Sequence, residues 1–447
     1  MQTSFAPALL ADPAMAASEA VIRKCVHCGF CIATCPTYVL LGDELDSPRG
    51  RIYLMKDMLE NERAPTAKVV KHVDRCLSCL SCMTTCPSGV NYMHLVDHAR
   101  AYIEERYRRP WRERLFRALL AAVLPHQARF RLALSLARLA RPAMPLVDRI
   151  AVLRPVAAMM ALAPRHTPHR PSKAPSPAAV TRGRVALLQG CAEPVLRPEI
   201  REATVRLLNR VGYDVTFARG EGCCGALVHH MGKDAASLDA ARRNVDAWTR
   251  EIEGGGVEAI VVTTSGCGTT IKNYGFILRN DTAYADKAAR VSALTKDISE
   301  LLIEAGLPLG DGRGLTVAYH AACSLQHGQK VVEAPMRLLV EAGYIVRTPI
   351  EAHLCCGSAG TYNILQPVIA GQLGERKVAH LARLNADVIA TGNIGCAIQI
   401  GQRAATPVVH TVELLDWATG GPEPRGVTYF DERKFARRVS LSTKLMP

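Results

Sequence analysis

The sequence predicts a mainly α-helical N-terminal domain followed by two repeated α/β domains, each built on a parallel sheet. Helical patterns and cysteine-rich loops fill the first 110 residues, and strands alternate with helices after residue 183. The cysteine pattern of the α/β part also occurs twice. Alternating β and α segments form mostly parallel sheets with helices on their faces.

Length and composition allow several cores. With 447 residues, of which 49% are hydrophobic, the chain is too long for one ordinary domain. The first residues have no basic region before an apolar stretch, so no secretory signal is predicted. No run reaches the roughly 18 apolar residues needed to cross a membrane. The best candidates, 118–124 and 156–163, are far too short. Sixteen clustered cysteines favour reduced thiols in the cytoplasm over an extracellular disulfide scaffold.

The chain is basic, with a formal net charge of +14. Much of the excess lies between Arg100 and Arg184. It is explained by solvated faces of arginine-rich helices, or by attraction to an anionic membrane or an acidic partner. Aromatic residues are not interleaved with these arginines as a base-stacking surface requires. No nucleic-acid partner is therefore expected.

The N-terminal domain, predicted as residues 1–110, contains two cysteine runs with the same spacing. Each reads C-x2-C-x2-C-x3-C and is followed by a proline. This spacing is typical of proteins with two [4Fe–4S] clusters, in which the fourth cysteine of each run ligates the other cluster. Zinc sites usually pair two C-x2-C motifs across a longer gap. The sequence therefore favours a ferredoxin-like domain with two clusters over zinc or disulfides. The predicted ligands are Cys25, Cys28, Cys31 and Cys86 for the first cluster, and Cys76, Cys79, Cys82 and Cys35 for the second.

Helices are expected around these runs. The segment from Arg51 has helical spacing of Ile52, Met55 and Leu59, and a second helix follows the second run up to Pro110. Residues 111–182 read as arginine-rich amphipathic helices broken by prolines, ending in a linker rich in proline and serine, 164–184.

The predicted third domain, 183–310, alternates strands and helices. The apolar strand RVALLQGC leads to Cys191, and the strand DVTFA precedes a Cys-Cys-Gly (CCG) motif at 223–225. The β-branched run AIVVTTSGC then leads to Cys267. Most of these cysteines follow strand ends, where open α/β sheets bind ligands. Four thiolates are expected to converge on one point.

The predicted fourth domain, 311–420, repeats this plan, and residues 421–447 form a tail. Cys323, Cys355 and Cys356 each lie 132 residues after Cys191, Cys223 and Cys224, and Cys396 lies 129 residues after Cys267. Such a fixed offset is an internal repeat. We call the two repeats the first and second CCG domains. Their cysteines suit an iron–sulfur cluster, a zinc site or a redox-active thiol pair, or are buried as small hydrophobic residues. Spacing alone leaves these alternatives open.

Other residues give weaker signals. Five histidines near the CCG motifs are candidate ligands, proton relays or quinone contacts, although a packed or exposed histidine is the commoner case. They are His229, His230, His320, His327 and His353. Arg49 and Arg51 suit either an acidic partner surface or a solvated loop. No nucleotide or flavin fingerprint and no catalytic residue set is recognisable.

The motifs resemble the iron–sulfur subunits of bacterial glycolate oxidase (glycolate dehydrogenase). The stretches that carry the resemblance are CVHCGFC, LGDELDSPRGRIYL, DRCLSC, GCCGA, TTSGCG, LCCGSAGTYN and NIGC. The resemblance implies that FAD-containing partner subunits oxidise glycolate to glyoxylate. It also implies that this chain passes the electrons towards a membrane quinone, from the inner face of the cell membrane.

Related families provide the alternatives. Iron–sulfur subunits of lactate or glycerol-3-phosphate dehydrogenase complexes are similar, and heterodisulfide reductase subunits share the CCG repeats. In the last family a closing C-x-x-C adds a ligand, but here Thr270 and Gln399 occupy those positions. This departure argues against a noncubane cluster of that kind.

Overall fold

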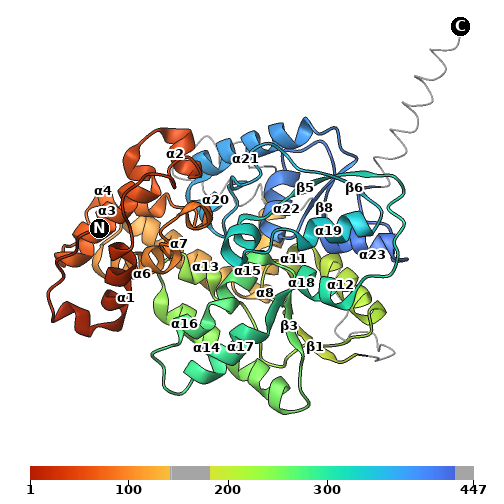
Figure 1. The fold of residues 1–447 in the computed structure, drawn as a ribbon, viewed down its shortest axis with the longest axis horizontal. Helices are drawn as coiled ribbons and strands as arrows, with labels where there is room; N and C mark the ends of the chain where they lie inside the picture. The colour runs from red at the N-terminus through yellow and green to blue at the C-terminus, as the bar shows by residue number, and fades with distance from the viewer. Residues whose placement is uncertain (141, 143–181, 428–447) are drawn as a thin grey trace, which may run out of the picture.

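The structure, a computed structural model, describes residues 1–140, 142 and 182–427. Most of the predicted linker and of the predicted tail lies outside these residues, as does the apolar stretch 156–163. The described part consists of a helical N-terminal domain and two α/β domains (Figure 1). The predicted fold class is therefore confirmed.

The N-terminal domain is helical. The apolar residues predicted to share one helix face, Ile52, Met55 and Leu59, are all buried in its core. The helix after the second cysteine run ends at Arg106, four residues before the predicted stop at Pro110. Its α-helices are α1 (Pro13–Arg23), α2 (Pro36–Leu41), α3 (Pro48–Glu60), α4 (Ala67–Asp74), α5 (Ser81–Thr85) and α6 (Tyr92–Arg106), with 3-10 turns η1 (Leu9–Ala11) and η2 (Glu44–Asp46).

Two amphipathic helices, α7 (Trp111–Val123) and α8 (Gln127–Leu139), follow, as predicted. Pro125 lies between them. They pack on the first CCG domain: the Gln127 side chain donates to the Gly190 carbonyl at 2.8 Å, and Arg131 donates to that of Pro194 at 3.1 Å.

The first CCG domain contains a parallel sheet of four strands in the order β2-β1-β3-β4. Every residue of the central strand β3 is buried, as expected for a parallel strand covered on both faces. The strands are β1 (Arg184–Leu187), β2 (Asp214–Thr216), β3 (Ala259–Val262) and β4 (Thr295–Asp297). The helices are α11 (Glu193–Leu196), α12 (Pro198–Arg210), α13 (Ala226–His229), α14 (Asp234–Glu253), α15 (Ser265–Lys272), α16 (Tyr274–Ile277), α17 (Ala285–Leu294) and α18 (Ile298–Ala305).

The second CCG domain has the same topology, with the strand order β6-β5-β7-β8 and all pairs parallel. The sequence repeat is thus a repeat of structure. Its strands are β5 (Thr316–His320), β6 (Ile345–Arg347), β7 (Val388–Thr391) and β8 (Val408–His410). Its helices are the π-helical turn η5 (Ser324–Gln329), α19 (Ala334–Glu341), α20 (Tyr362–Leu365), α21 (Pro367–Ala382), α22 (Ile394–Gly401) and α23 (Thr411–Ala418).

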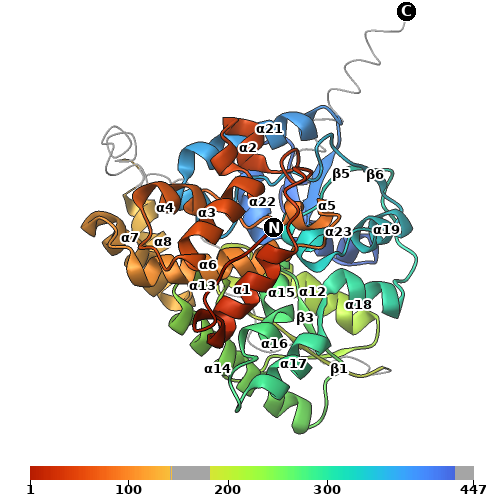
Figure 2. The same cartoon turned by 60° about the vertical axis from the view of Figure 1, so that its left-hand side comes forward.

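The two CCG domains share one hydrophobic core. Helix α12 packs on α23, and α18 packs on α19. Because α12 corresponds to α19 in the repeat and α18 corresponds to α23, the two contacts are equivalent. Buried Asp416 on α23 accepts hydrogen bonds from Arg206 and Arg210 on α12, at 2.6 and 3.1 Å. The N-terminal domain lies against both CCG domains, with α2 beside α21 in both views (Figure 2).

Gly232 lies at a close approach between the N-terminal domain and the first CCG domain. It has a φ of +77°, and a Cβ there would lie 2.3 Å from the carbonyl oxygen of Arg100 on α6. Gly256 has a φ of +76°, and a Cβ at that position would have no atom within 4 Å. Alanine at Gly256 therefore adds backbone strain alone, whereas alanine at Gly232 adds the same strain and an overlap with the N-terminal domain.

We expect Gly256→Ala to lower the free energy of unfolding by about 1 kcal/mol, the cost of a left-handed alanine. Gly232→Ala should lower it by about 3 kcal/mol or more, because overpacking adds to the same strain. Anaerobic denaturant unfolding measures both. Equal losses in the two variants would contradict this interdomain contact.

Candidate cluster and metal sites

The first cysteine run lines a cavity at the surface of the N-terminal domain. Its walls include Cys25, Cys28 and Cys31 from the first run and Cys86 from the second. Cys82 also reaches this cavity. The side chain of Cys28 is exposed, and the neighbouring Val26 and Phe30 are 65% and 63% exposed.

A second cavity lies deeper in the N-terminal domain. It is lined by Cys76, Cys79 and Cys82 from the second run and by Cys35 from the first. Each cavity thus combines three cysteines of one run with the last cysteine of the other. This is the arrangement that the spacing predicts for two clusters.

The two runs share a strained backbone conformation. Residues at equivalent positions have positive φ: His27 and Ser78 at +55° and +50°, and Gly29 and Leu80 at +87° and +63°. Non-glycine residues in this region cost of order 1–3 kcal/mol, and such strain clusters at ligand sites. The two loops therefore make the same turn around the cysteines that line their cavities.

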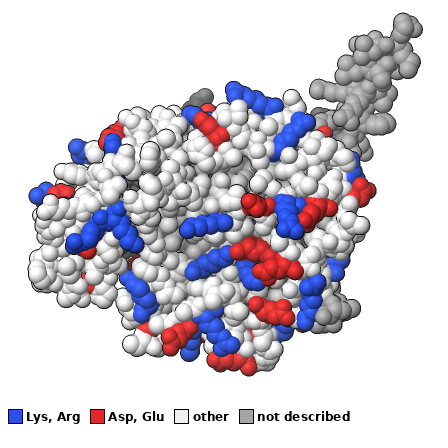
Figure 3. Space-filling view, in the orientation of Figure 1, with Lys and Arg blue, Asp and Glu red and all other residues white. Residues whose placement is uncertain are grey.

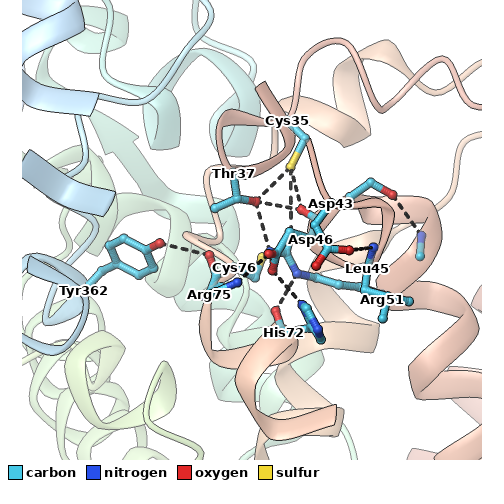
Figure 4. A network of polar contacts seen from close by, with 12 residues as sticks. Cys35, Thr37, Asp43, Leu45, Asp46, Arg51, His72, Arg75, Cys76 and Tyr362 are labelled. Carbon is cyan, nitrogen blue, oxygen red and sulfur yellow. Dashed lines mark hydrogen bonds and ion pairs between the residues drawn. The ribbon is translucent and has the colours of Figure 1, made fainter. Parts of the chain in front are cut away.

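A buried ionic network supports the second cavity (Figure 4). Arg51 is 1% exposed and donates to the His72 carbonyl at 2.6 Å, and it forms an ion pair with Asp46 at 3.3 Å. Its guanidinium also lies 3.8 Å from the Cys35 sulfur. Arg75 contacts the other Asp46 oxygen at 2.7 Å. This places a fixed positive charge beside a cysteine of the second cavity.

The interpretation of Arg51 as part of a solvated loop or partner surface is therefore wrong. It points inward from α3 because Asp46 of η2 and Thr37 of α2 provide its partners. Arg49 remains half-exposed and pairs with Glu44 at 2.8 Å. No local pattern distinguishes the two arginines, since the difference arises from elements brought together in the fold.

The four cysteines of the first CCG domain come together at the ends of the strands. Cys191 follows β1, Cys223 and Cys224 follow β2, and Cys267 is on α15 after β3. Hydrogen bonds from the thiols of Cys191 and Cys224 hold the pKa of Cys223 well below its usual range. The Cys267 thiol in turn contacts Cys224. The sulfurs therefore form a chain of neighbours rather than isolated thiols.

Glycine is required after each cysteine pair. Gly225 and Gly357 have φ values of +86° and +90°. A Cβ on Gly357 would lie 2.6 Å from the Ala370 carbonyl oxygen of α21, and one on Gly225 would lie 3.2 Å from that of Ser237 on α14. The CCG motif thus turns the chain against a helix and directs both thiols to the site.

The second CCG domain has the same arrangement with additional polar groups. Cys323 and Cys355 have sulfurs 3.6 Å apart, and Cys356 lies near Cys396 on α22. His320, at the end of β5, contributes a ring nitrogen to the same cluster. The buried Lys377 on α21, whose pKa is lowered by burial, donates to the Glu351 carbonyl at 2.7 Å.

The other predicted histidines have separate roles. His229 pairs with Asp97 of α6 at 3.1 Å, and this carboxylate raises the pKa of the imidazole although burial opposes the change. Burial lowers the pKa of His230 to about 4. His327 is hydrogen-bonded to Thr84 at 2.8 Å, and His353 is half-buried. Of the five, only His320 joins the cysteines.

The second CCG domain contacts the second cluster loop directly. Leu77 and Cys79 pack in one hydrophobic cluster with Cys355 and Tyr362. The Tyr362 hydroxyl donates to the Arg75 carbonyl at 3.0 Å. The cysteine runs did not predict this contact, because it joins segments almost 300 residues apart.

Charge is mixed on the face drawn in Figure 3, where acidic and basic side chains alternate over the CCG domains and form no single basic stripe. Among the described residues, no helix is both long and apolar enough to cross a membrane.

Comparison with known proteins identifies the two kinds of domain. A family model described as a 4Fe-4S dicluster domain matches residues 24–90. One described as a cysteine-rich domain matches residues 185–272 and again 317–401. A crystal structure of a hypothetical protein from Helicobacter pylori superposes with a TM-score of 0.52 at 12% identity, covering 86% of this chain and 69% of that one. This last likeness concerns the fold alone.

Relatives match along nearly the whole length. The glycolate oxidase iron-sulfur subunit of Escherichia coli (strain K12) is 41% identical, over 94% of this chain and 99% of its own. The probable glycolate oxidase iron-sulfur subunit of Bacillus subtilis (strain 168) is 31% identical, over 90% and 95%. Lactate utilization protein A of Bacillus licheniformis is 29% identical over 52% of this chain and 99% of its own. The chain belongs to the family of glycolate oxidase iron-sulfur subunits.

Proposed function

We propose that this chain is the electron-transfer subunit of a glycolate dehydrogenase. The observation that carries the proposal is the pair of cavities, each lined by three cysteines of one run and the last cysteine of the other. This pattern fits two [4Fe–4S] clusters, because each cluster needs four thiolates and the runs exchange their fourth. Cys25, Cys28, Cys31 and Cys86 would hold one cluster, and Cys76, Cys79, Cys82 and Cys35 the other.

When bound, such clusters accept and donate single electrons. The protein's own contribution is to fix the thiolates and to set the surrounding charge. The buried Arg51 guanidinium beside Cys35 favours the more negative, reduced state and so raises the reduction potential. The Tyr92 hydroxyl, 3.8 Å from the Cys76 sulfur, acts in the same direction as a hydrogen-bond donor.

The two sites differ in exposure, which suggests a direction for electron flow. The first cavity opens beside exposed Val26, Phe30 and Cys28, whereas the second is enclosed by the CCG domain. Electrons would enter at the exposed loop, where an FAD-containing partner subunit docks on the apolar side chains. FAD belongs to that partner in this proposal, since no flavin fingerprint occurs in this chain.

Glycolate is proposed as the substrate of the partner, following the names of the relatives that match nearly the whole chain. The similarity to lactate utilization protein A covers only about half of the chain and makes lactate the competing substrate. A quinone in the membrane is proposed as the final acceptor. No described residue is assigned to bind glycolate or quinone.

Peripheral attachment to the inner membrane face is supported by α7 and α8. Trp111, Leu115 and Leu119 form an exposed apolar row on α7. Leu132, Leu136 and Leu139 form another on α8. Arginines flank both rows. A helix pair with exposed leucines and adjacent arginines suits the surface of an anionic bilayer.

Purification of the tagged chain without oxygen tests the proposal. We expect flavoprotein subunits to copurify, both iron and acid-labile sulfide to be present, and glycolate to reduce an added quinone analogue. Reduction by lactate or glycerol 3-phosphate with none by glycolate would overturn the substrate. Zinc without sulfide would overturn the cluster assignment.

A further inference from the structure

The second CCG domain contains a histidine where the first has a leucine. His320 ends strand β5, and the residue 132 positions earlier, at the corresponding place after β1, is Leu188. The four cysteines are shared by both domains, but this imidazole is not. The two sites therefore differ in the ligands that they offer.

The atoms around His320 are close enough for a single ion. One ring nitrogen of His320 and the sulfurs of Cys356 and Cys396 all lie within 4.8 Å of one another. Ligands bound to one ion at about 2.0–2.3 Å are at most about 4.6 Å apart, so a small inward shift of these side chains brings them within binding distance of one ion. Among the described residues, no three cysteines of the first CCG domain have sulfurs this close.

The imidazole of His320 has no partner besides the Cys356 thiol. It is 1% exposed, and neither ring nitrogen has a hydrogen bond of good geometry. Leaving a buried polar group without a partner costs about 1–3 kcal/mol, so such groups call for an explanation. A bound ion on one nitrogen removes much of this cost. Either Cys323 or Cys355, whose sulfurs are 3.6 Å apart, would provide the fourth ligand.

We infer that the second CCG domain, and not the first, holds a single thiophilic metal ion on His320, Cys356 and Cys396. Imidazole with thiolates is the donor set of zinc or ferrous iron in tetrahedral sites. A cluster held by cysteines alone would not use the histidine.

The charge nearby fits this assignment. Three or more thiolates around a divalent ion leave a net negative site, which needs compensation when buried. The Lys377 side chain is 2% exposed, and burial lowers its pKa, while the nearby Cys356, Cys355 and Cys396 oppose that lowering. In the first domain, α14 instead places the neutral Asn244 beside the cysteine pair, where its side chain donates to the Cys223 carbonyl at 3.1 Å.

The position of the site gives it a consequence for electron transfer. Cys355 shares a hydrophobic cluster with Cys79, one of the cysteines of the second cavity. The first CCG site is instead covered by α8, through Gln127 and Arg131. If the proposed function holds, the metal ion is the neighbour of the second cluster and influences its potential. The ion-binding claim itself does not require the clusters.

Metal analysis of the full-length protein tests the inference. Zinc and iron are counted on anaerobically purified chain, and X-ray absorption identifies the atoms bound to the ion. We expect one zinc or ferrous ion beyond the cluster iron, with both nitrogen and sulfur neighbours. Mössbauer spectroscopy separates a ferrous thiolate site from cluster iron.

Matched variants locate the ion. His320→Leu copies the residue of the first domain and should lose the nitrogen neighbour and about a hundredfold or more in affinity, as measured against a chelator. Cys396→Ala should behave alike, whereas its first-domain counterpart Cys267→Ala should keep the ion. EPR signals of the N-terminal clusters should persist in all three, so that a failure here is distinct from a failure of the proposed function.

Two results would overturn the inference. A folded His320→Leu protein that keeps the ion with unchanged neighbours would remove the histidine from the site. If that variant does not fold, the wild-type spectrum decides, because an ion with sulfur neighbours alone excludes His320. Loss of the ion in Cys267→Ala, with retention in Cys396→Ala, would place it in the first domain.

Discussion

Replacing Asp46 by asparagine should destabilise the N-terminal domain by about 3–5 kcal/mol, the usual cost of leaving a buried charge without its partner. Asp46 is fully buried and faces three cationic or titratable groups: Arg51 at 3.3 Å, Arg75 at 2.7 Å and His72 at 2.9 Å. Asparagine keeps the shape but not the charge. The Arg51 guanidinium, which is 1% exposed, then has no anion beside it except the cysteines.

The matched control is Asp43→Asn, three residues away. Asp43 is exposed and accepts a hydrogen bond from the Leu45 amide at 3.0 Å as the cap of η2. Asparagine caps almost as well as aspartate, so we expect a change well below about 1 kcal/mol. Anaerobic thermal unfolding should show a drop of about 10 °C or more for Asp46→Asn and almost none for the control.

The iron content of the Asp46→Asn variant is a second, independent measure of what this network contributes. Because Arg51 lies against Cys35, its release should loosen the second cavity and lower the iron bound there. The first cavity, which neither Arg51 nor Cys35 lines, should keep its iron. Equal unfolding midpoints for Asp46→Asn and Asp43→Asn would show that the network contributes nothing to stability.

Local spacing is enough to predict the cysteine sets but not their surroundings. The three cysteines of a run are six residues apart at most, so the turn that joins them fixes which thiols meet. The repeat at an offset of 132 likewise predicts two equal sheets, because equal patterns of strands and helices fold alike. Both predictions rest on short-range information.

The buried network around Arg51 could be recognised only from the folded structure. An arginine on a helix is usually solvated, and only the approach of η2 and α4 makes it buried. The difference between His320 and Leu188 is visible in the aligned repeats, yet its meaning depends on the position of the buried imidazole beside Cys356 and Cys396. The contact of Cys79 with the second rather than the first CCG domain depends on how whole domains pack. No local pattern encodes that choice.

Replacing Cys28 by alanine should have the largest effect on electron transfer. Cys28 is the exposed member of the first cavity, so its loss removes a thiolate without opening a hole in the core. We expect the unfolding midpoint of the rest of the chain to change little. One of the two EPR signals of the reduced clusters should disappear. Turnover with quinone should fall by about a hundredfold or more, because losing a ligand costs more than losing a residue that only orients one.

Flavin reduction separates this loss from a loss of assembly. In the intact complex, glycolate should still bleach the flavin of the partner subunit, because that step precedes the clusters, while reoxidation by quinone should stall. Val26→Ala, a change in the same exposed loop that spares all thiolates, is the control and should keep both signals. Normal quinone reduction by Cys28→Ala protein would mean that electrons bypass the first cluster. Slow flavin reoxidation in the control, with both EPR signals retained, would instead show that the loop is needed for docking, since Val26 provides apolar surface and no ligand.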